Sequence, residues 1–191
     1  DTMHELGGAI PVEDVQVMGG SFVSDEWMGR HVVPAYAGWY NEADRVPGFE
    51  FHKQMLQHLQ WKCPGDRWVL KSPSHMSQLD ALLSVYPDAR IVFTHRGPLK
   101  VLPSVVSILY STAYVRSDKV DAEAMANWFT GETCKMLLDG MTSLRASGRL
   151  PESQCYDLRY AELMKDPVAA LGGIYEHFEI DYPDSSRAAQ Q

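Results

Sequence analysis

Four side chains that can bind or transfer an anionic group stand just beyond two apolar runs of this sequence. Lys71 directly follows the first run and His75 comes four residues later. Arg96 follows the second run and Ser104 lies eight residues beyond it. A Lys can neutralise a transferring anionic group, and a His can take a proton from an attacking hydroxyl near neutral pH. These residue types indicate a site where an anionic group is bound or transferred.

The pair Arg96 and Ser104 indicates phosphate binding in particular. An Arg at the end of a strand offers a planar fork that binds phosphate through two parallel hydrogen bonds. A Ser in the following helix can add its hydroxyl, and each charge-assisted hydrogen bond contributes about 1.5–3 kcal/mol. The spacing alone occurs often by chance. Its place after an apolar strand, with Gly97-Pro98 at the turn, favours a phosphate site over ordinary surface charges.

These residues require a parallel sheet that brings the ends of its strands to one edge. Apolar runs predict strands over 67–70 and 90–94, joined by an amphipathic helix over 76–86 in a parallel crossover. A third strand is predicted over 153–160, with Tyr160 at its end. Ligands of open parallel sheets bind beyond the carboxyl ends of the strands. The predicted fold class is therefore α/β, with a parallel sheet flanked by helices.

Helices account for most of the second half of the chain. The segment 99–116 is apolar and helical, with Pro103 as a late start or a kink. A long helix is predicted over 122–146 from a stripe of apolar residues at helical spacing, and Gly148 suits the residue just past its end. Asp166-Pro167 is typical of a helix start, with the Asp as cap.

The first third of the chain is rich in aromatic residues. Phe22, Trp27, Tyr36, Trp39 and Tyr40 either line a pocket for an acceptor or pack between two short helical pieces that Pro34 separates. An amphipathic helix follows, and its apolar residues are Phe51, Met55, Leu56 and Leu59. On this helix, His52 and His58 are predicted to be solvated on the polar side.

Composition limits the class of protein. The 191 residues fit one domain, and 45% hydrophobic with 22% charged residues is ordinary for a globular protein. The net charge of −8 argues against nucleic acid as a partner, because such a surface needs a basic face. A local basic cluster in an acidic chain is correspondingly more informative.

The cysteines indicate the redox environment, and the first residue bears on whether the sequence is a fragment. Cys63, Cys134 and Cys155 are odd in number and form no Cys-x-x-Cys pair, so neither a disulfide framework nor a zinc site is expected. We expect a reducing, cytoplasmic location and no metal. No run of 18 apolar residues could span a membrane. Because the first residue is Asp1 rather than Met, we expect a piece of a longer chain.

Together these motifs resemble those of the sulfotransferase family. The segment Arg67-Trp-Val-Leu-Lys-Ser-Pro-Ser-His75 and the segment Tyr86-Pro-Asp-Ala-Arg-Ile-Val-Phe-Thr-His-Arg-Gly-Pro-Leu-Lys-Val-Leu-Pro-Ser104 are similar to the bacterial pattern LKxPxH…YPDARIVxxHRDPxxVxxS. Leu158-Arg-Tyr160, with Leu163 and Asp166-Pro167 after it, resembles that family's Y-x-x-L-x-x-x-P segment. The resemblance covers roughly 67–178.

The resemblance implies a fold, a co-substrate and roles for five residues. The fold would be the sulfotransferase relative of the P-loop kinases, and the co-substrate 3′-phosphoadenosine 5′-phosphosulfate (PAPS). Arg96 and Ser104 match the residues that bind the 3′-phosphate, and Tyr160 matches a position near the adenine. Lys71 would steady the transferring sulfonyl group. His75 would be the base that deprotonates a small-molecule hydroxyl acceptor.

Two departures from the family pattern leave alternatives open. The family's Lys/Arg-x-Gly-Ser/Thr-Ser/Thr loop, which cradles the 5′-phosphosulfate after the first strand, is absent from this sequence, and Gly97 replaces the usual Asp. We therefore expect an incomplete single domain, with 1–66 as a helical acceptor side and 67–180 as the nucleotide-binding core. The alternative is a truncated, non-catalytic domain that binds 3′-phosphoadenosine nucleotides weakly or not at all. A nucleotide kinase is disfavoured because the sequence has no Walker loop.

Overall fold

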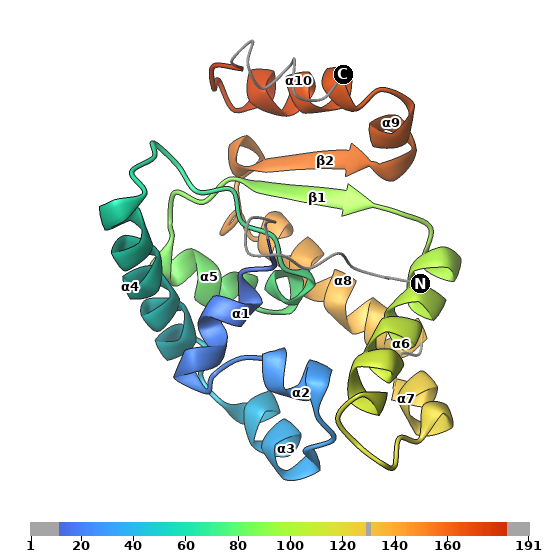
Figure 1. The fold of residues 1–191 in the computed structure, drawn as a ribbon. Helices are drawn as coiled ribbons and strands as arrows, with labels where there is room; N and C mark the ends of the chain where they lie inside the picture. Colours follow the sequence, from blue (N-terminus) through green and yellow to red (C-terminus); the bar gives the residue numbers. More distant parts are fainter. Residues whose placement is uncertain (1–11, 129–130, 183–191) are drawn as a thin grey trace. The chain divides into compact units, whose positions relative to one another are not determined.

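The computed structural model describes residues 12–128 and 131–182, which form two compact units (Figure 1). The first unit comprises the described residues of Asp1–Pro87 and Ser104–Met141. The second unit comprises those of Asp88–Pro103 and Thr142–Gln191. The helices α6 (Pro98–Tyr114) and α8 (Gly131–Ala146) contribute residues to both units.

The second unit is built on a parallel pair of strands. Strand β1 (Ile91–His95) pairs with β2 (Cys155–Arg159), with Phe93 opposite Asp157. A short 3₁₀ helix (Glu152–Gln154) leads into β2, and α9 (Tyr160–Lys165) and α10 (Pro167–His177) follow it. Figure 1 shows α10 running along β2. The predictions of strands over 90–94 and 153–160 are thus confirmed to within a few residues.

The cap predicted for the last helix is also confirmed. The side chain of Asp166 accepts a hydrogen bond from the backbone N–H of Ala169 at 2.9 Å, and Pro167 occupies the first turn of α10. A short polar side chain before a Pro satisfies one of the free N–H groups at a helix start and presets the backbone. This local chemistry ends the short helix α9 and starts α10 at a defined residue.

The strand predicted over 67–70 is wrong. Among the residues that the structure describes, the sheet has two strands, and residues 67–72 have no regular secondary structure. Trp68, Val69 and Leu70 are 42%, 86% and 37% exposed. A strand needs a neighbour to complete its hydrogen bonds, and an apolar run alone does not supply one. The crossover between parallel strands therefore leads from β1 to β2 and not from 67–70 to β1.

The first unit is helical. Its elements are α1 (Val15–Met18), a 3₁₀ turn (Gly19–Ser21), α2 (Glu26–Arg30), α3 (Pro34–Glu42), α4 (Val46–Lys62), the 3₁₀ helix η2 (Pro73–Ser77) and α5 (Leu79–Val85). Helix α4 packs against α5 and α1. The core of these elements consists of Val15, Met18, Tyr40, Phe49, Leu56, Leu79 and Leu82.

The buried face of α4 differs from the predicted stripe. The helix buries Gly48, Phe49, His52 and Leu56, whereas Met55 and Leu59 are 36% and 47% exposed. Phe49, His52 and Leu56 follow the i, i+3, i+7 spacing of one helix face. Counting His52 as a polar residue puts the predicted apolar face of α4 on the side of Met55 and Leu59. The prediction that His52 is solvated is wrong, while His58 is exposed as expected.

Two further helix predictions have mixed outcomes. Helix α6 runs continuously through Pro103, so the alternative of a late start is wrong. The long helix predicted over 122–146 corresponds to α7 (Ala122–Trp128) and α8, and residues 129–130 between them lie outside the described residues. Gly148 has a φ of 75° just past the end of α8, which confirms its place as a helix stop.

We predict that Gly48→Ala destabilises the first unit and that Gly38→Ala does not. A Cβ at Gly48 would lie 2.6 Å from the backbone oxygen of Val23, so the backbone must shift. The expected cost is about 1–3 kcal/mol. A Cβ at Gly38, in α3, meets nothing within 4 Å and should stabilise the helix by about 0.5–1 kcal/mol. Urea unfolding of both variants checks this, and equal stabilities would contradict the packing of α4 against Val23.

Candidate functional site

The segment that carries Lys71 and His75 lies in the first unit and is fixed by local hydrogen bonds. The Ser72 hydroxyl accepts from the backbone N–H of Ser74 at 3.2 Å, and Pro73 starts the 3₁₀ helix η2. The carbonyl of Lys71 accepts from the backbone N–H of Asp14 at 3.3 Å. This bond ties the start of α1 to the segment, so that Asp14 and His75 can meet.

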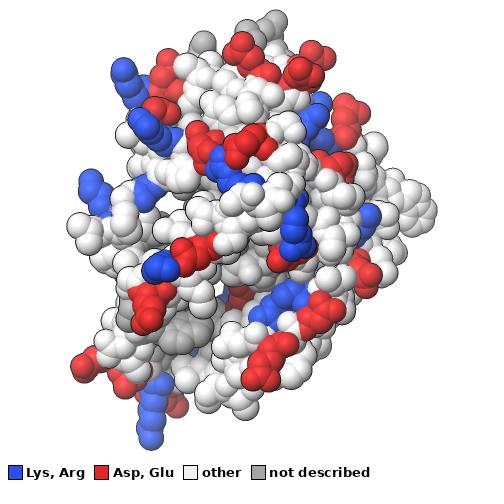
Figure 2. All heavy atoms as spheres, turned by 180° about the vertical axis from the view of Figure 1, so that it is seen from behind, with Lys and Arg blue, Asp and Glu red and all other residues white. Residues whose placement is uncertain are grey.

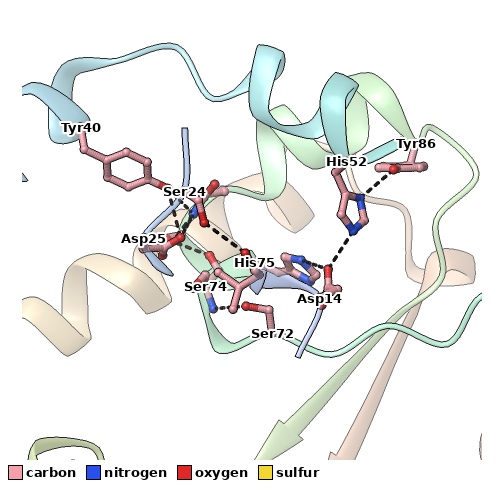
Figure 3. Close-up of polar contacts among 12 residues, drawn as sticks. Asp14, Ser24, Asp25, Tyr40, His52, Ser72, Ser74, His75 and Tyr86 are labelled. Carbon is pink, nitrogen blue, oxygen red and sulfur yellow. Dashed lines mark hydrogen bonds and ion pairs between the residues drawn. The ribbon is translucent and has the colours of Figure 1, made fainter. Parts of the chain in front are cut away.

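Asp14 is the centre of a buried polar cluster that brings four segments together (Figure 3). Its Oδ2 lies 2.9 Å from Nε2 of His75 and 3.3 Å from Nε2 of His52. On the far side of that imidazole, Nδ1 of His52 lies 2.8 Å from the hydroxyl of Tyr86. The two carboxylate contacts have ion-pair distances but lack the alignment of ordinary hydrogen bonds. The side chain of Asp14 is 4% exposed, that of His52 1% and that of His75 19%.

The cluster holds a negative charge in the interior. Burial alone would raise the pKa of the Asp14 carboxyl, but its contacts with His52 and His75 outweigh burial and hold the pKa far below its ordinary value of 3.8. Burial, with a smaller contribution from the charge of Asp14, raises the pKa of Tyr86 to about 12. The carboxyl is therefore ionised and the phenol is protonated near neutral pH.

Lys71 has a different environment. Its ammonium group forms an ion pair with the carboxylate of Glu13, the neighbour of Asp14. The Lys71 side chain is 68% exposed and that of Glu13 is 34% exposed. A pair this exposed holds its partners together only weakly.

A second network holds the far end of η2. Gln78 is buried, and its amide donates to the hydroxyl of Tyr40 at 3.0 Å and to a carboxylate oxygen of Asp25 at 3.2 Å. The Tyr40 hydroxyl donates to Asp25 at 3.1 Å, and the guanidinium carbon of Arg45 lies 3.5 Å from the centre of the Tyr40 ring. Figure 3 shows Asp25 and Tyr40 beside the cluster of Asp14. Both ends of η2 are thus anchored around His75.

In the second unit, Arg96 stacks on Tyr160. The guanidinium carbon lies 4.5 Å from the centre of the Tyr160 ring, a cation–π contact of ordinary length. Arg96 is exposed and Tyr160 is 36% exposed. Within the described residues Arg96 has no carboxylate partner. Its hydrogen-bonding fork is therefore free of a competing acid, which fits a residue that binds an external anion.

Two acids in and before β2 are neutralised by other groups. Arg145 forms bonds to Asp157 at 2.9 Å and to Glu152 at 2.6 Å, and Nε2 of His95 lies 2.7 Å from Asp157. Burial raises the pKa of Asp157, but these contacts outweigh it and lower the pKa below its ordinary value. Figure 2 shows acidic and basic side chains interspersed in this way over one face of the molecule.

The predicted site residues thus divide between the units. Lys71 and His75 lie in one segment of the first unit, and Arg96 and Tyr160 contact each other in the second unit. Ser104 is an exposed residue of α6 and belongs to the first unit.

Sequence reasoning missed the partners of these residues. These partners come from three segments that are far apart in the chain, at Glu13–Asp14, His52 and Tyr86. No spacing rule relates these segments to His75. The one available signal was the position of His52 on the same helix face as Phe49.

A profile of the sulfotransferase family matches residues 14–184. The chain belongs to the sulfotransferase family. This confirms the resemblance drawn from the motifs. The match begins at Asp14 and includes all five predicted site residues.

Solved structures of the same family have a similar fold. The chain is 33% identical to the crystal structure of sulfotransferase STF1 from Mycobacterium tuberculosis, with a TM-score of 0.84 over 97% of this chain and 50% of that one. It is 30% identical to sulfotransferase STF9 from Mycobacterium avium, with a TM-score of 0.80 over 93% of this chain and 45% of that one. The predicted α/β sulfotransferase fold is therefore confirmed, as a helix-rich structure with a small parallel sheet.

A curated relative has a named substrate. The chain is 26% identical over 116 residues to omega-hydroxy-beta-dihydromenaquinone-9 sulfotransferase Stf3 of Mycobacterium bovis, and equally so to that of Mycobacterium tuberculosis. The matched region is 59% of this chain and 28% of the relative. The chain thus spans about half the length of the solved structures and less than a third of Stf3.

The described residues were compared with the requirements of a metal site and of a membrane-spanning helix. In residues 12–128 and 131–182, no group of three His, Cys, Asp or Glu side chains is arranged to hold a metal ion. None of the helices within these ranges has the length and apolar character needed to cross a membrane.

We predict that Asp14→Asn lowers the free energy of unfolding by about 1–3 kcal/mol at pH 7, because it removes the buried carboxylate that both imidazoles contact. The folded-state pKa of Asp14 is lowered, so its contribution is complete above the ordinary value of 3.8 and is lost as the pH falls from there towards the folded-state pKa. The difference between the two proteins should therefore shrink below about pH 4. Denaturant unfolding across pH 2–7 measures it.

Asp66→Asn is the matched control, because Asp66 lies in an exposed turn. A pH-independent difference for Asp14→Asn, or an equal loss in Asp66→Asn, would contradict the role of the buried Asp14 carboxylate.

Proposed function

We propose that this chain carries out, or forms part of an enzyme that carries out, transfer of a sulfonyl group from PAPS to an acceptor hydroxyl. The observation that carries the proposal is the family match, which extends over residues 14–184 and so includes every residue of the proposed site. The whole enzyme's activity is part of the proposal, because the chain covers half the length of the solved relatives.

In this proposal Arg96 and Ser104 bind the 3′-phosphate of the nucleotide. The geometry of Arg96 supports its role, since the guanidinium is exposed, stacked on Tyr160 and without a carboxylate partner among the described residues. A planar fork of this kind binds phosphate through two parallel hydrogen bonds. Tyr160 lies near the adenine.

Transfer requires a cation for the moving group and a base for the acceptor. Lys71 steadies the sulfonyl group. The acceptor oxygen forms a bond to sulfur while the bond from sulfur to the phosphate oxygen of PAPS breaks. His75 takes the acceptor's proton, and the products are a sulfate ester and adenosine 3′,5′-bisphosphate. The scheme needs no metal ion.

We propose residues 1–66 as the acceptor side and residues 67–180 as the nucleotide-binding core. The described aromatic residues of the acceptor side include Phe22 and Trp27, whose rings stack 5.4 Å apart. Phe22 is 64% exposed, and such a surface suits a small, apolar acceptor with a hydroxyl group. The substrate in the name of Stf3, a hydroxylated menaquinone, is of this class. Cys63, Cys134 and Cys155 are free thiols, which accords with a cytoplasmic location as part of the same proposal.

A second candidate function is binding without turnover. It is favoured by one observation: this sequence lacks the family's Lys/Arg-x-Gly-Ser/Thr-Ser/Thr loop. In that case the chain binds 3′-phosphoadenosine nucleotides weakly and transfers nothing. Incubation with ³⁵S-labelled PAPS and a hydroxylated menaquinone separates the two candidates, since only the enzyme produces a labelled ester.

We predict that Arg96→Ala weakens binding of adenosine 3′,5′-bisphosphate about 10- to 100-fold, which corresponds to about 1.5–3 kcal/mol for charge-assisted hydrogen bonds. Binding of adenosine 5′-monophosphate, which lacks the 3′-phosphate, should not change. Arg159→Ala is the matched control, because Arg159 is an exposed arginine of the same unit. Calorimetric titration of the unmodified chain and of both variants with each nucleotide measures these affinities. An equal loss for both nucleotides, or for both variants, would refute the assignment of Arg96.

We predict that Tyr160→Phe retains binding of adenosine 3′,5′-bisphosphate and that Tyr160→Leu loses it several-fold. Phe keeps the ring beneath the Arg96 guanidinium, and Leu removes it. The same titration with adenosine 5′-monophosphate tells the two roles of Tyr160 apart. If the ring contacts adenine, both nucleotides lose affinity in Tyr160→Leu. If it only supports Arg96, the loss is confined to the nucleotide with the 3′-phosphate. Unchanged binding of both would contradict either role.

A further inference from the structure

Two imidazoles meet the same carboxylate oxygen, and their other ring nitrogens have different surroundings. Nε2 of His52 and Nε2 of His75 both face Oδ2 of Asp14 (Figure 3). Nδ1 of His52 faces the hydroxyl of Tyr86. Nδ1 of His75 is the one nitrogen of the two rings that neither Asp14 nor Tyr86 contacts. This arrangement determines where the protons lie.

The proton positions of His52 follow from its two neighbours. The phenol of Tyr86 is protonated near neutral pH, so its O–H can donate to Nδ1 of His52 at 2.8 Å. The ring then carries its proton on Nε2, which faces the ionised Asp14. The lone pair on Nδ1 of His52 thus faces a hydroxyl donor, and the proton on Nε2 faces a carboxylate acceptor.

The same carboxylate determines the tautomer of His75. Nε2 of His75 lies 2.9 Å from Oδ2 of Asp14. A lone pair on Nε2 would repel the ionised oxygen at this distance, so Nε2 carries a proton. When His75 is neutral, its lone pair is therefore on Nδ1.

We propose that Asp14 is a positioning residue that holds His75 in the Nε2–H tautomer, so that Nδ1 of His75 takes the proton from the acceptor hydroxyl. The assignment of the tautomer rests on the contacts of the two rings with Asp14 and Tyr86. The part that concerns the acceptor rests on the proposed function.

The surroundings of His75 keep the ring in this orientation. Asp14 comes from the start of α1 and His52 from α4, and Phe49, also from α4, places its ring 5.9 Å from that of His75. The hydroxyl of Tyr86 contacts the other side of the His52 ring. Glu13, next to Asp14 in the sequence, forms an ion pair with Lys71, four residues before His75. The backbone N–H of Gln78 donates to the carbonyl of His75 at 3.0 Å and closes the short helix. Among these groups, Asp14 is the titratable one in contact with the imidazole of His75, and His52 contacts the same carboxylate oxygen.

The first test reads the tautomer directly. Long-range ¹H–¹⁵N correlation of the imidazoles in the unmodified chain, at a pH where His75 is neutral, distinguishes protonated from unprotonated ring nitrogens. We expect the pattern of Nε2–H for both His75 and His52, with assignments from His75→Gln and His52→Asn. His58 is the internal contrast, because its Nδ1 lies 2.8 Å from the carbonyl oxygen of Gln54 and should therefore show the Nδ1–H pattern. An Nδ1–H pattern for His75 overturns the proposal, and no folded Asp14 variant is needed for that result.

The second test is kinetic. Asp14→Asn should lower kcat for sulfonyl transfer about 100-fold or more, the range of general acid–base catalysis, with little change in the KM for PAPS. Asp66→Asn is the control and should match the unmodified chain. An unchanged kcat, or a rise in KM alone, overturns the role of Asp14. If the unmodified chain shows neither turnover nor nucleotide binding, the proposed function fails, while the NMR result still decides the tautomer.

Discussion

Asp14 places a negative charge in the interior of the first unit, where the start of α1, helix α4, η2 and the residue after α5 meet. An isolated buried carboxylate costs several kcal/mol, and only close partners offset that cost. His52 and His75 are the partners here, and they lie in segments that are distant in sequence. Any arrangement that separated them would leave the charge unpaired. The position of His75 within this unit is therefore a consequence of burying Asp14.

Two guanidinium groups of the second unit, those of Arg145 and Arg96, differ in what surrounds them. Arg145 is bonded to both Asp157 and Glu152, so its hydrogen-bonding capacity is largely used within the protein. The guanidinium of Arg96 stacks on the ring of Tyr160, which attracts its charge without occupying its N–H donors. An incoming phosphate would have to displace carboxylates at Arg145 but not at Arg96. The chemistry of the neighbours, and not the residue type, distinguishes a structural arginine from one suited to bind an anion.

What the sequence could predict depended on whether the deciding interaction was local. The cap at Asp166 and the stop at Gly148 follow from backbone chemistry within a few residues, and both were found. The strand over 67–70 failed because a strand is defined by its neighbour, which lies elsewhere in the chain. The burial of His52 was missed for the same reason, since its partner Asp14 is 38 positions away. The motifs indicated single residues of the candidate site, whose roles stay predictions, whereas the residues that contact them could be found only from the fold.

The adjacent acids Glu13 and Asp14 bind Lys71 and His75, and the strengths of the two pairs differ in a way that suits the proposed reaction. The pair of Glu13 with Lys71 is exposed, and such pairs contribute only about 0–1 kcal/mol. An anionic sulfonyl donor can therefore replace Glu13 at Lys71 with little loss. The contact of Asp14 with His75 is buried at the carboxylate, and leaving a buried charged group without its partner costs about 1–3 kcal/mol or more. The same two-residue segment thus leaves Lys71, the proposed cation, exchangeable while it keeps His75, the proposed base, in a fixed orientation.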